Sequence, residues 1–148
     1  MLTKTGIRFR HIAGEGENTS SLSAQAANIA LERANLDPAD VELIIMATSS
    51  GDYNSIPSTA CVVQSLIGAK NAGAMDLTAA CTGFIYGLET ARSFIRSGSV
   101  KNVLVIGAEV LTRAVDWNDR GSCVLFGDGA GAAVVLPDTD ERETDKRL

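Results

Sequence analysis

Two nearly continuous apolar runs set the strongest limit on what this chain can fold into. They are VELIIMATSS at residues 41–50 and KNVLVIGAEV at residues 101–110. Both are short and rich in β-branched residues, which is typical of a strand that is covered on both faces. Segments with helical periodicity precede and separate them. Strands that alternate with helices predict an α/β unit with a mixed, largely parallel sheet.

Helices are predicted at three places. From Ser20 or Ser21, either of which suits an N-cap, apolar residues recur at helical spacing until RANLDP ends the pattern. A second helix has Pro57 in its first turn and ends at Gly68. A short strand at residues 74–78 leads into the third helix. The buried side of that third helix is predicted to consist of Phe84, Ile85, Leu88, Ala91 and Ile95.

The C-terminal part is predicted to end in a β-hairpin. Two runs, CVLF and GAAVVL, flank the sequence GDGA, whose glycines suit a turn. The residues after them are mostly charged. Residues 1–136 are therefore taken as one domain and residues 137–148 as a frayed tail.

Composition and charge exclude several classes of function. The chain has 148 residues, 45% of them hydrophobic, which indicates one globular domain with a sizeable core. Its formal net charge is −5 and it has no strongly basic run, so we expect no nucleic-acid partner. We find no apolar stretch long enough to span a membrane and no secretory signal, so we expect no membrane contact and a cytoplasmic location.

The cysteines divide into two kinds. Cys61, Cys81 and Cys123 are widely spaced and the chain has one histidine, which argues against structural zinc, another bound metal or a disulfide framework. Free thiols in a reducing compartment fit better. Because Cys61 and Cys123 lie within apolar patterns, we expect them to be core residues.

Cys81 stands between a short apolar run and a glycine-punctuated helix. Small residues precede it and Gly83 follows it, so the chain can turn sharply there and place the thiol in the first helical turn. Helix N–H groups and the positive end of the helix dipole favour a thiolate, and they could also hydrogen-bond an oxyanion on an attacked thioester. The alternative is a small buried hydrophobe. His11, the only histidine that could serve as a base, lies in a polar segment that favours a solvated surface position.

Several blocks of the sequence resemble the β-ketoacyl-acyl-carrier-protein synthase III family of the thiolase-like superfamily. They are TGIRFRHIA, PSTACVVQSLIGAKNAGAMDLTAACTGF and SGSVKNVLVIGAEVLTRAVDWNDRGSCVLFGDGAGAAVVL, in the family's order from about Thr5 to Leu136. The resemblance implies a thiolase-like fold, in which the subunit is a tandem duplication of one α/β unit. This chain covers the first copy without its first strand, and its AACTGF block places the family's active cysteine at Cys81.

The resemblance implies an acyltransferase of fatty-acid biosynthesis. In that family an acyl group passes from coenzyme A to the cysteine and then condenses with malonyl-acyl-carrier protein, with loss of carbon dioxide. Coenzyme A enters as a thioester substrate, so no cofactor is implied. The implied partners are acyl-CoA, malonyl-acyl-carrier protein, and a second copy in a homodimer or a complementary second half.

Individual positions extend the resemblance. Lys4 stands where the family has a basic residue near the coenzyme A phosphates, and Trp117 lies too far along the chain to replace the tryptophan that precedes the TG pair in relatives. Ile56 matches a position, often phenylalanine, that borders the partner's acyl pocket in the family dimer. An aliphatic residue there would favour tolerance of an acyl primer other than acetyl. Asp128 matches a block near the site, although a tight hairpin would also explain it.

Three hypotheses remain open from the sequence. The first is the N-terminal half of a synthase III, inactive in condensation by itself because the family's catalytic histidine and asparagine belong to the second half and His11 does not match that histidine. The second is a non-catalytic interaction half-domain that pairs with a separate second half or with itself. The third is another acyltransferase of the superfamily, such as a polyketide or hydroxymethylglutaryl synthase, against which the AACTGF and VDWNDR blocks argue.

Overall fold

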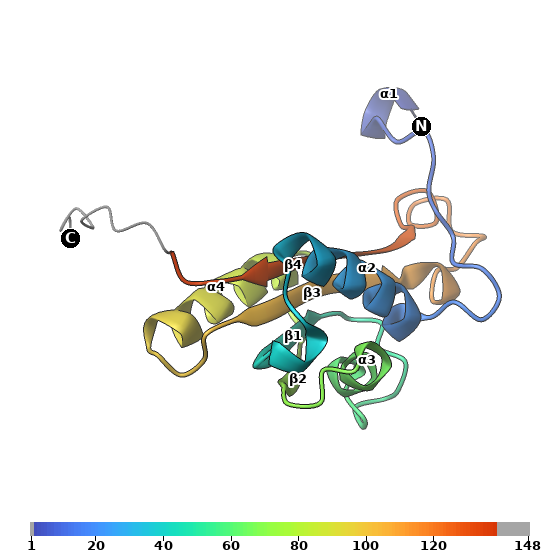
Figure 1. The fold of residues 1–148 in the computed structure, drawn as a ribbon. Coiled ribbons are helices and arrows are strands. Elements are labelled where there is room, and N and C mark those ends of the chain that lie inside the picture. Colours follow the sequence, from blue (N-terminus) through green and yellow to red (C-terminus); the bar gives the residue numbers. More distant parts are fainter. Residues whose placement is uncertain (1, 139–148) are drawn as a thin grey trace, which may run out of the picture.

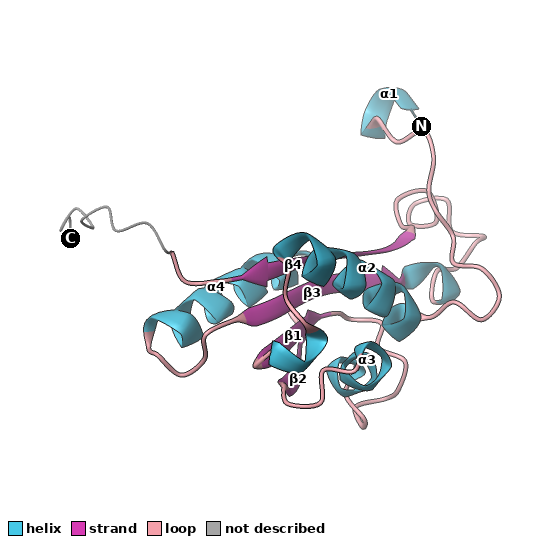
Figure 2. Ribbon diagram, viewed as in Figure 1, coloured by secondary structure: helices cyan, strands magenta, loops and turns pink. Residues whose placement is uncertain are grey.

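The computed structural model describes residues 2–138, so most of the predicted charged tail lies outside the described residues. A four-stranded sheet runs through the molecule with helices on both faces (Figures 1 and 2). The strand order is β2-β1-β3-β4; β1 is parallel to β2 and β3, and β4 is antiparallel to β3. The predicted α/β class with a mixed, largely parallel sheet is confirmed. The strands are β1 (Leu43–Ala47), β2 (Gly73–Leu77), β3 (Val103–Val110) and β4 (Asp128–Val135).

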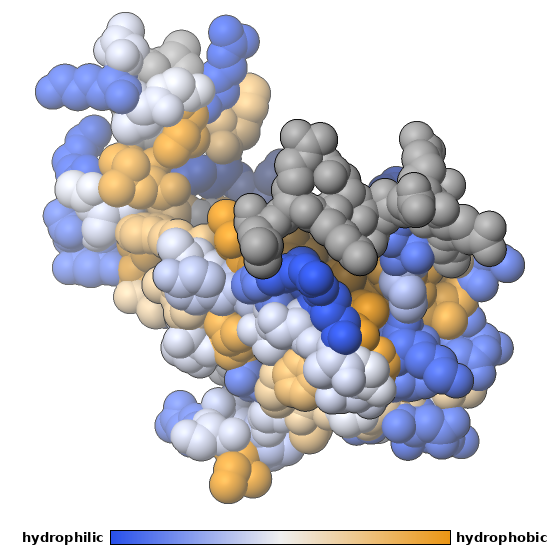
Figure 3. All heavy atoms as spheres, turned by 90° about the vertical axis from the view of Figure 1, so that its left-hand side faces the viewer, coloured by the Kyte–Doolittle hydropathy of each residue, from blue (hydrophilic) through white to orange (hydrophobic). Residues whose placement is uncertain are grey.

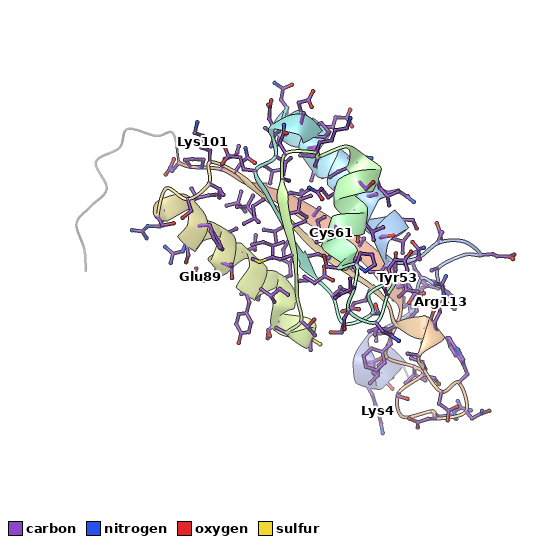
Figure 4. All side chains as sticks on the ribbon, turned by 90° about the horizontal axis from the view of Figure 1, so that it is seen from below. Lys4, Tyr53, Cys61, Glu89, Lys101 and Arg113 are labelled. Atoms are coloured by element: carbon purple, nitrogen blue, oxygen red, sulfur yellow. The ribbon has the colours of Figure 1, made fainter. Side chains whose placement is uncertain are left out.

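Three longer helices cover the two faces of the sheet. α2 and α3 pack on one face and α4 on the other, as the view in Figure 4 shows. Short 3-10 turns connect several of these elements. Among residues 2–138, no helix is long and apolar enough to cross a bilayer. The helical elements are α1 (Leu2–Thr5), α2 (Thr19–Ala34), η1 (Pro38–Asp40), α3 (Thr59–Ile67), η2 (Ala80–Thr82), α4 (Gly83–Arg96) and η3 (Leu111–Arg113).

The two central strands are buried on both sides, which explains their continuous apolar sequences. Ile44 and Met46 of β1 pack in the core under α2 and α3, whereas Ile45 packs under α4. Leu104 of β3 faces the first core and Val105 the second. All five side chains are fully buried. Burial of each contributes about 1.5 to 3 kcal/mol, so these strands fix the position of the whole sheet.

The starts of α2 and α3 differ from the predicted positions. α2 is capped by Asn18 rather than by Ser20 or Ser21. The Asn18 side chain accepts a hydrogen bond from the Ser21 N–H, and the Ser21 hydroxyl accepts one from the Asn18 N–H. Ser21 is therefore the third residue of a reciprocal capping box. In α3, Pro57 precedes the cap Ser58 instead of lying in the first turn.

Both ends of α3 are held by specific contacts. At its C-terminus Gly68 adopts a φ of 77°, in the left-handed region, as predicted. At its N-terminus the carboxylate of Asp76, from β2, accepts hydrogen bonds of 2.7 Å from the N–H groups of Thr59 and Ala60. A carboxylate at this end also interacts favourably with the helix dipole. Asp76 thus ties β2 to the start of α3.

The predicted C-terminal hairpin is wrong. GDGA does not form its turn, because Asp128 already begins β4, which pairs along β3 from Val110 back towards its start. The preceding CVLF segment is not a strand. The Asp119 carbonyl accepts hydrogen bonds from the N–H groups of Ser122 and Cys123, and this winds the segment into consecutive turns. The N–H groups of Cys123 and Leu125 donate within these turns and are then not available for a strand ladder.

Burial corrects two further expectations. Cys123 is buried as predicted, but Cys61 is exposed because it lies beside the buried stripe of α3 rather than on it. Ile85 is 66% exposed, since Gly83 and Gly87 are the residues that α4 turns towards the sheet. The other four predicted apolar residues of α4 do pack in the core. Apolar residues also lie among polar ones on the face shown in Figure 3.

The tie between β2 and α3 gives a stability prediction. Asp76→Asn is expected to lower the free energy of unfolding by about 1 to 3 kcal/mol, because the amide keeps one acceptor oxygen for two N–H groups and has no charge for the helix dipole. Urea denaturation followed by circular dichroism measures the change. Asp40→Asn, at an exposed carboxylate, is the matched control and should stay within about 0.5 kcal/mol. Equal effects of the two substitutions would contradict the assignment.

Candidate active site

The C-terminal ends of the parallel strands open onto a cavity of about 740 Å³. Ala47 at the end of β1, Cys81 after β2 and the last part of β3 contribute to its lining. Open α/β sheets bind their ligands at this edge. Most of the lining is apolar, and its polar side chains are Ser49, Cys81 and Glu109. The cavity suits an apolar group whose reactive end meets these side chains.

Cys81 lies in the short turn η2, immediately before α4. The chain does turn sharply from strand to helix there, as the sequence predicts, but the thiol precedes the first turn of α4 instead of lying in it. Ala80 has a φ of 48°, a left-handed conformation that residues with a side chain rarely adopt. Cys81 is exposed, so the alternative of a buried hydrophobe is wrong.

Glycines allow α4 to lie close to the sheet beside this turn. A Cβ atom on Gly83 would lie 3.2 Å from the Ala47 Cβ, and one on Gly87 would lie 2.9 Å from the Val105 Cγ1. Such distances leave no room for a side chain without a shift. The start of α4 therefore rests directly on the end of β1, which brings Cys81 to the cavity.

Glu109 is a site residue that the sequence interpretation missed. Glu109 is one of the residues that line the cavity, and its carboxylate accepts hydrogen bonds from the N–H of Ser49 (2.8 Å) and the hydroxyls of Thr48 (3.3 Å) and Ser50. The sequence signal was a lone acidic residue at the end of an apolar strand, in KNVLVIGAEV. Its partners belong to a loop about 60 residues earlier, and spacing alone does not reveal them.

Asp128 fastens the N-terminal segment to the end of the sheet. Its carboxylate accepts hydrogen bonds from the Ala13 N–H (2.8 Å), the Thr112 N–H (2.9 Å) and the Thr112 hydroxyl (2.6 Å). Burial by itself raises the pKa of Asp128, but these hydrogen bonds and the charge of Arg113 outweigh burial and hold the pKa below its usual value. These hydrogen bonds, and not a hairpin turn, give the structural reason for an aspartate at position 128.

Other candidate residues lie outside the cavity lining. His11 is exposed and is not among the lining residues. Lys4 is exposed on α1, at the same end of the molecule as Arg113 and away from Lys101 (Figure 4). Ile56 is 89% exposed, in the loop between β1 and α3. Within residues 2–138, no group of three or more His, Cys, Asp or Glu side chains could hold a metal ion.

The fold is that of the thiolase-like proteins among its solved structural neighbours. Residues 75–146 match the family model of 3-oxoacyl-[acyl-carrier-protein] synthase III. The chain is 58% identical over 139 residues to the β-ketoacyl-[acyl-carrier-protein] synthase III of Clostridium perfringens, covering 94% of this chain and 42% of that protein. With the synthase III of Xylella fastidiosa it shares 54% identity over 138 residues, covering 93% of this chain and 42% of that protein.

Solved structures agree with the sequence matches. The crystal structure of 3-oxoacyl-[acyl-carrier-protein] synthase III from Aquifex aeolicus superposes with a TM-score of 0.91 at 55% identity, covering 94% of this chain and 44% of that one. The priming β-ketosynthase of the R1128 polyketide pathway gives a TM-score of 0.88 at 41% identity, covering 92% of this chain and 40% of that one. The chain thus spans 42% of the length of these curated relatives and belongs with the N-terminal half of the β-ketoacyl-acyl-carrier-protein synthase III family. The resemblance predicted from the sequence is confirmed.

The contacts of Asp128 predict a pH-dependent effect. Asp128→Asn is expected to lower the free energy of unfolding by about 1 kcal/mol at neutral pH, because hydrogen bonds to a carboxylate are lost. A carboxyl whose pKa is lowered by folding stabilises the protein above its unfolded pKa, and this contribution is lost as the pH falls through the folded pKa. The difference between wild type and variant should therefore shrink as the pH falls from about 5 to about 3.

Urea denaturation at several pH values measures this difference. Asp40→Asn is again the control at an exposed carboxylate. A penalty for Asp128→Asn that stays constant down to the lowest pH would show that the charge on Asp128 is not what holds the N-terminal segment.

Proposed function

We propose that this chain carries the acyl-accepting half of a β-ketoacyl-acyl-carrier-protein synthase III, with Cys81 as its nucleophile. The observation that carries the proposal is the position of Cys81, exposed in a sharp strand-to-helix turn and lining a mostly apolar cavity at the C-terminal edge of the sheet. The family supplies the reaction class. The cavity supplies a place for an acyl chain beside the thiol.

In the proposed first half-reaction, the Cys81 thiolate attacks the thioester carbonyl of an acyl-CoA. A new bond forms between Sγ and the carbonyl carbon, the bond to the coenzyme A sulfur breaks, and that sulfur leaves as a thiolate that takes a proton. The N–H groups at the start of α4, which follow Cys81 in the chain, would stabilise the oxyanion. Phe84, Leu111 and Phe126 offer apolar contacts to the acyl chain. Coenzyme A acts here as part of a substrate and not as a cofactor.

The second half-reaction requires a carbanion from malonyl-acyl-carrier protein. In the family, a histidine and an asparagine stabilise the charge that develops during decarboxylation, and both belong to the second half. The only histidine among these 148 residues is His11, which does not line the cavity. We therefore expect the chain by itself to stop at the acyl-enzyme. Condensation with malonyl-acyl-carrier protein would need a complementary second half.

Two further roles follow from the family resemblance. Lys4 would contact the phosphates of coenzyme A, and its exposed position on α1 supports this role. Ile56 would border the acyl pocket of a second copy in a homodimer. Its 89% exposure, in the loop between β1 and α3, supports an outward-reaching role.

A second candidate function has its own supporting observation. On α4, the side chains of Ile85, Tyr86 and Phe94 are 66%, 54% and 37% exposed, on a helix whose other side packs on the sheet. Exposed apolar residues that gather on one helix are typical of an interaction surface. The chain would then be a non-catalytic half-domain that pairs with a separate second half or with itself.

Acylation of the purified chain separates the two candidates. After incubation with acetyl-CoA, intact mass and peptide mapping are expected to show one acetyl group on the Cys81 peptide. Cys81→Ala should lower the labelling by at least about a hundredfold, because the nucleophile itself is removed. Cys61→Ala is the matched control at another exposed free thiol, and it should label like wild type.

Two outcomes would contradict the catalytic proposal. Labelling that follows Cys61 or Cys123 would overturn the assignment of Cys81. A folded chain that associates in solution but takes up no acetyl group would favour the interaction half-domain.

A further inference from the structure

We propose that Glu109 is a positioning residue of the Cys81 cavity, whose carboxylate fixes the loop at residues 48–52 and so holds Ser49 in the cavity lining. The inference rests on the proposed function of Cys81 and adds a residue that acts through its neighbours rather than on the substrate. Ser49 and Glu109 line the same cavity as Cys81, so the loop and the nucleophile share one space.

The hydrogen bonds of the Glu109 carboxylate lead to one loop. Oε1 accepts from the Ser49 N–H at 2.8 Å, and Oε2 accepts from the Thr48 hydroxyl at 3.3 Å and from the Ser50 hydroxyl. Three consecutive residues thus donate to the two oxygens of one side chain. Hydrogen bonds to an ionised carboxylate are stronger than those between neutral groups. A neutral or shorter side chain could not accept all three.

The Glu109 carboxylate binds the chain just beyond the point where the pairing of β1 with β3 ends. The pairing of β1 with β3 stops at Ala47 and Gly107, so the residues that follow Ala47 have no strand partner in β3. Glu109, two residues beyond Gly107, holds them instead. The link is closed by the N–H of Val110, which donates to the Ser50 hydroxyl at 2.9 Å. Ser50 therefore accepts from the β3 backbone and donates to the β3 side chain.

This link is coupled to the turn that carries the nucleophile. The Thr78 hydroxyl donates to the Thr48 carbonyl at 3.2 Å, and Thr78 stands three residues before Cys81. On its other side the loop is held by α2, where the Thr19 hydroxyl donates to the Ser50 carbonyl at 2.5 Å. Without the Glu109 carboxylate the loop would keep its tie to α2 and the bond from the Val110 N–H to the Ser50 hydroxyl, but it would lose its three bonds to the β3 side chain. Ser49 would then shift relative to Cys81.

The test compares Glu109→Ala and Glu109→Gln with Glu32→Ala, a control at an exposed position of α2. Hydrogen–deuterium exchange reports the loop directly. In Glu109→Ala the amides of residues 48–52 are expected to exchange at least about tenfold faster, while those of β3 and α4 keep their wild-type rates. Glu109→Gln should recover part of this protection, because its carbonyl oxygen can still accept from the Ser49 N–H.

Two reactions of the Cys81 thiol report the consequence for the site. Acylation by acetyl-CoA, which must fit the cavity, is expected to slow at least about tenfold in Glu109→Ala, whereas alkylation by the small reagent iodoacetamide should stay within about threefold of wild type. Glu109→Gln should acylate at an intermediate rate. If Glu109→Ala fails to fold, the same exchange and thiol-reaction measurements are made on Ser50→Ala and Glu109→Gln.

Three results would overturn the inference. They are unchanged exchange of the loop in Glu109→Ala, a parallel loss of both thiol reactions, and Glu109→Gln behaving no better than Glu109→Ala. A wild-type chain that is not acylated at Cys81 would instead refute the proposed function. The exchange comparison would still decide whether Glu109 holds the loop.

Discussion

The close approach of α4 to the sheet is the contact on which the rest of the site depends. Gly83 and Gly87 face the sheet from the helix, and Gly107 of β3 faces back, with only 3.1 Å between a Cβ built on it and the ring of Phe84. A side chain at any of these positions would require the helix or its neighbours on the sheet to shift. With glycine there, the helix lies low enough for the turn before it to bring Cys81 to the ends of the parallel strands.

The site combines a rigid apolar floor with polar groups at its edge. β1 and β3 are buried on both faces, so the strand ends that form the floor are fixed by two cores. Beyond the end of the strand pairing, the Glu109 carboxylate fixes the chain by accepting hydrogen bonds from Ser49 and Ser50. On another side, Asp128 holds the N-terminal segment through Ala13. An exposed thiol among such fixed neighbours is suited to accept an acyl group.

The sequence predicted those features that depend on local patterns. Continuous apolar runs identified the central strands, and small residues with a following glycine identified the turn at Cys81. Features that depend on contacts between residues far apart in the sequence were not predicted. GDGA has the composition of a turn, but its Asp128 pairs with Val110 in a strand instead. Cys61 belongs to an apolar segment, yet the rotation of α3 exposes it. Glu109 is a single acidic residue whose loop partners meet it only in the folded chain.

A double-mutant cycle between Gly87 and Val105 tests the central contact most directly. Gly87→Ala alone should destabilise the chain because its methyl group would lie 2.9 Å from the Val105 Cγ1. Val105→Ala alone should destabilise it by leaving a cavity. If α4 rests on the sheet here, the double variant will be more stable than the sum of the single effects by at least about 1 kcal/mol. Effects that simply add would contradict this account.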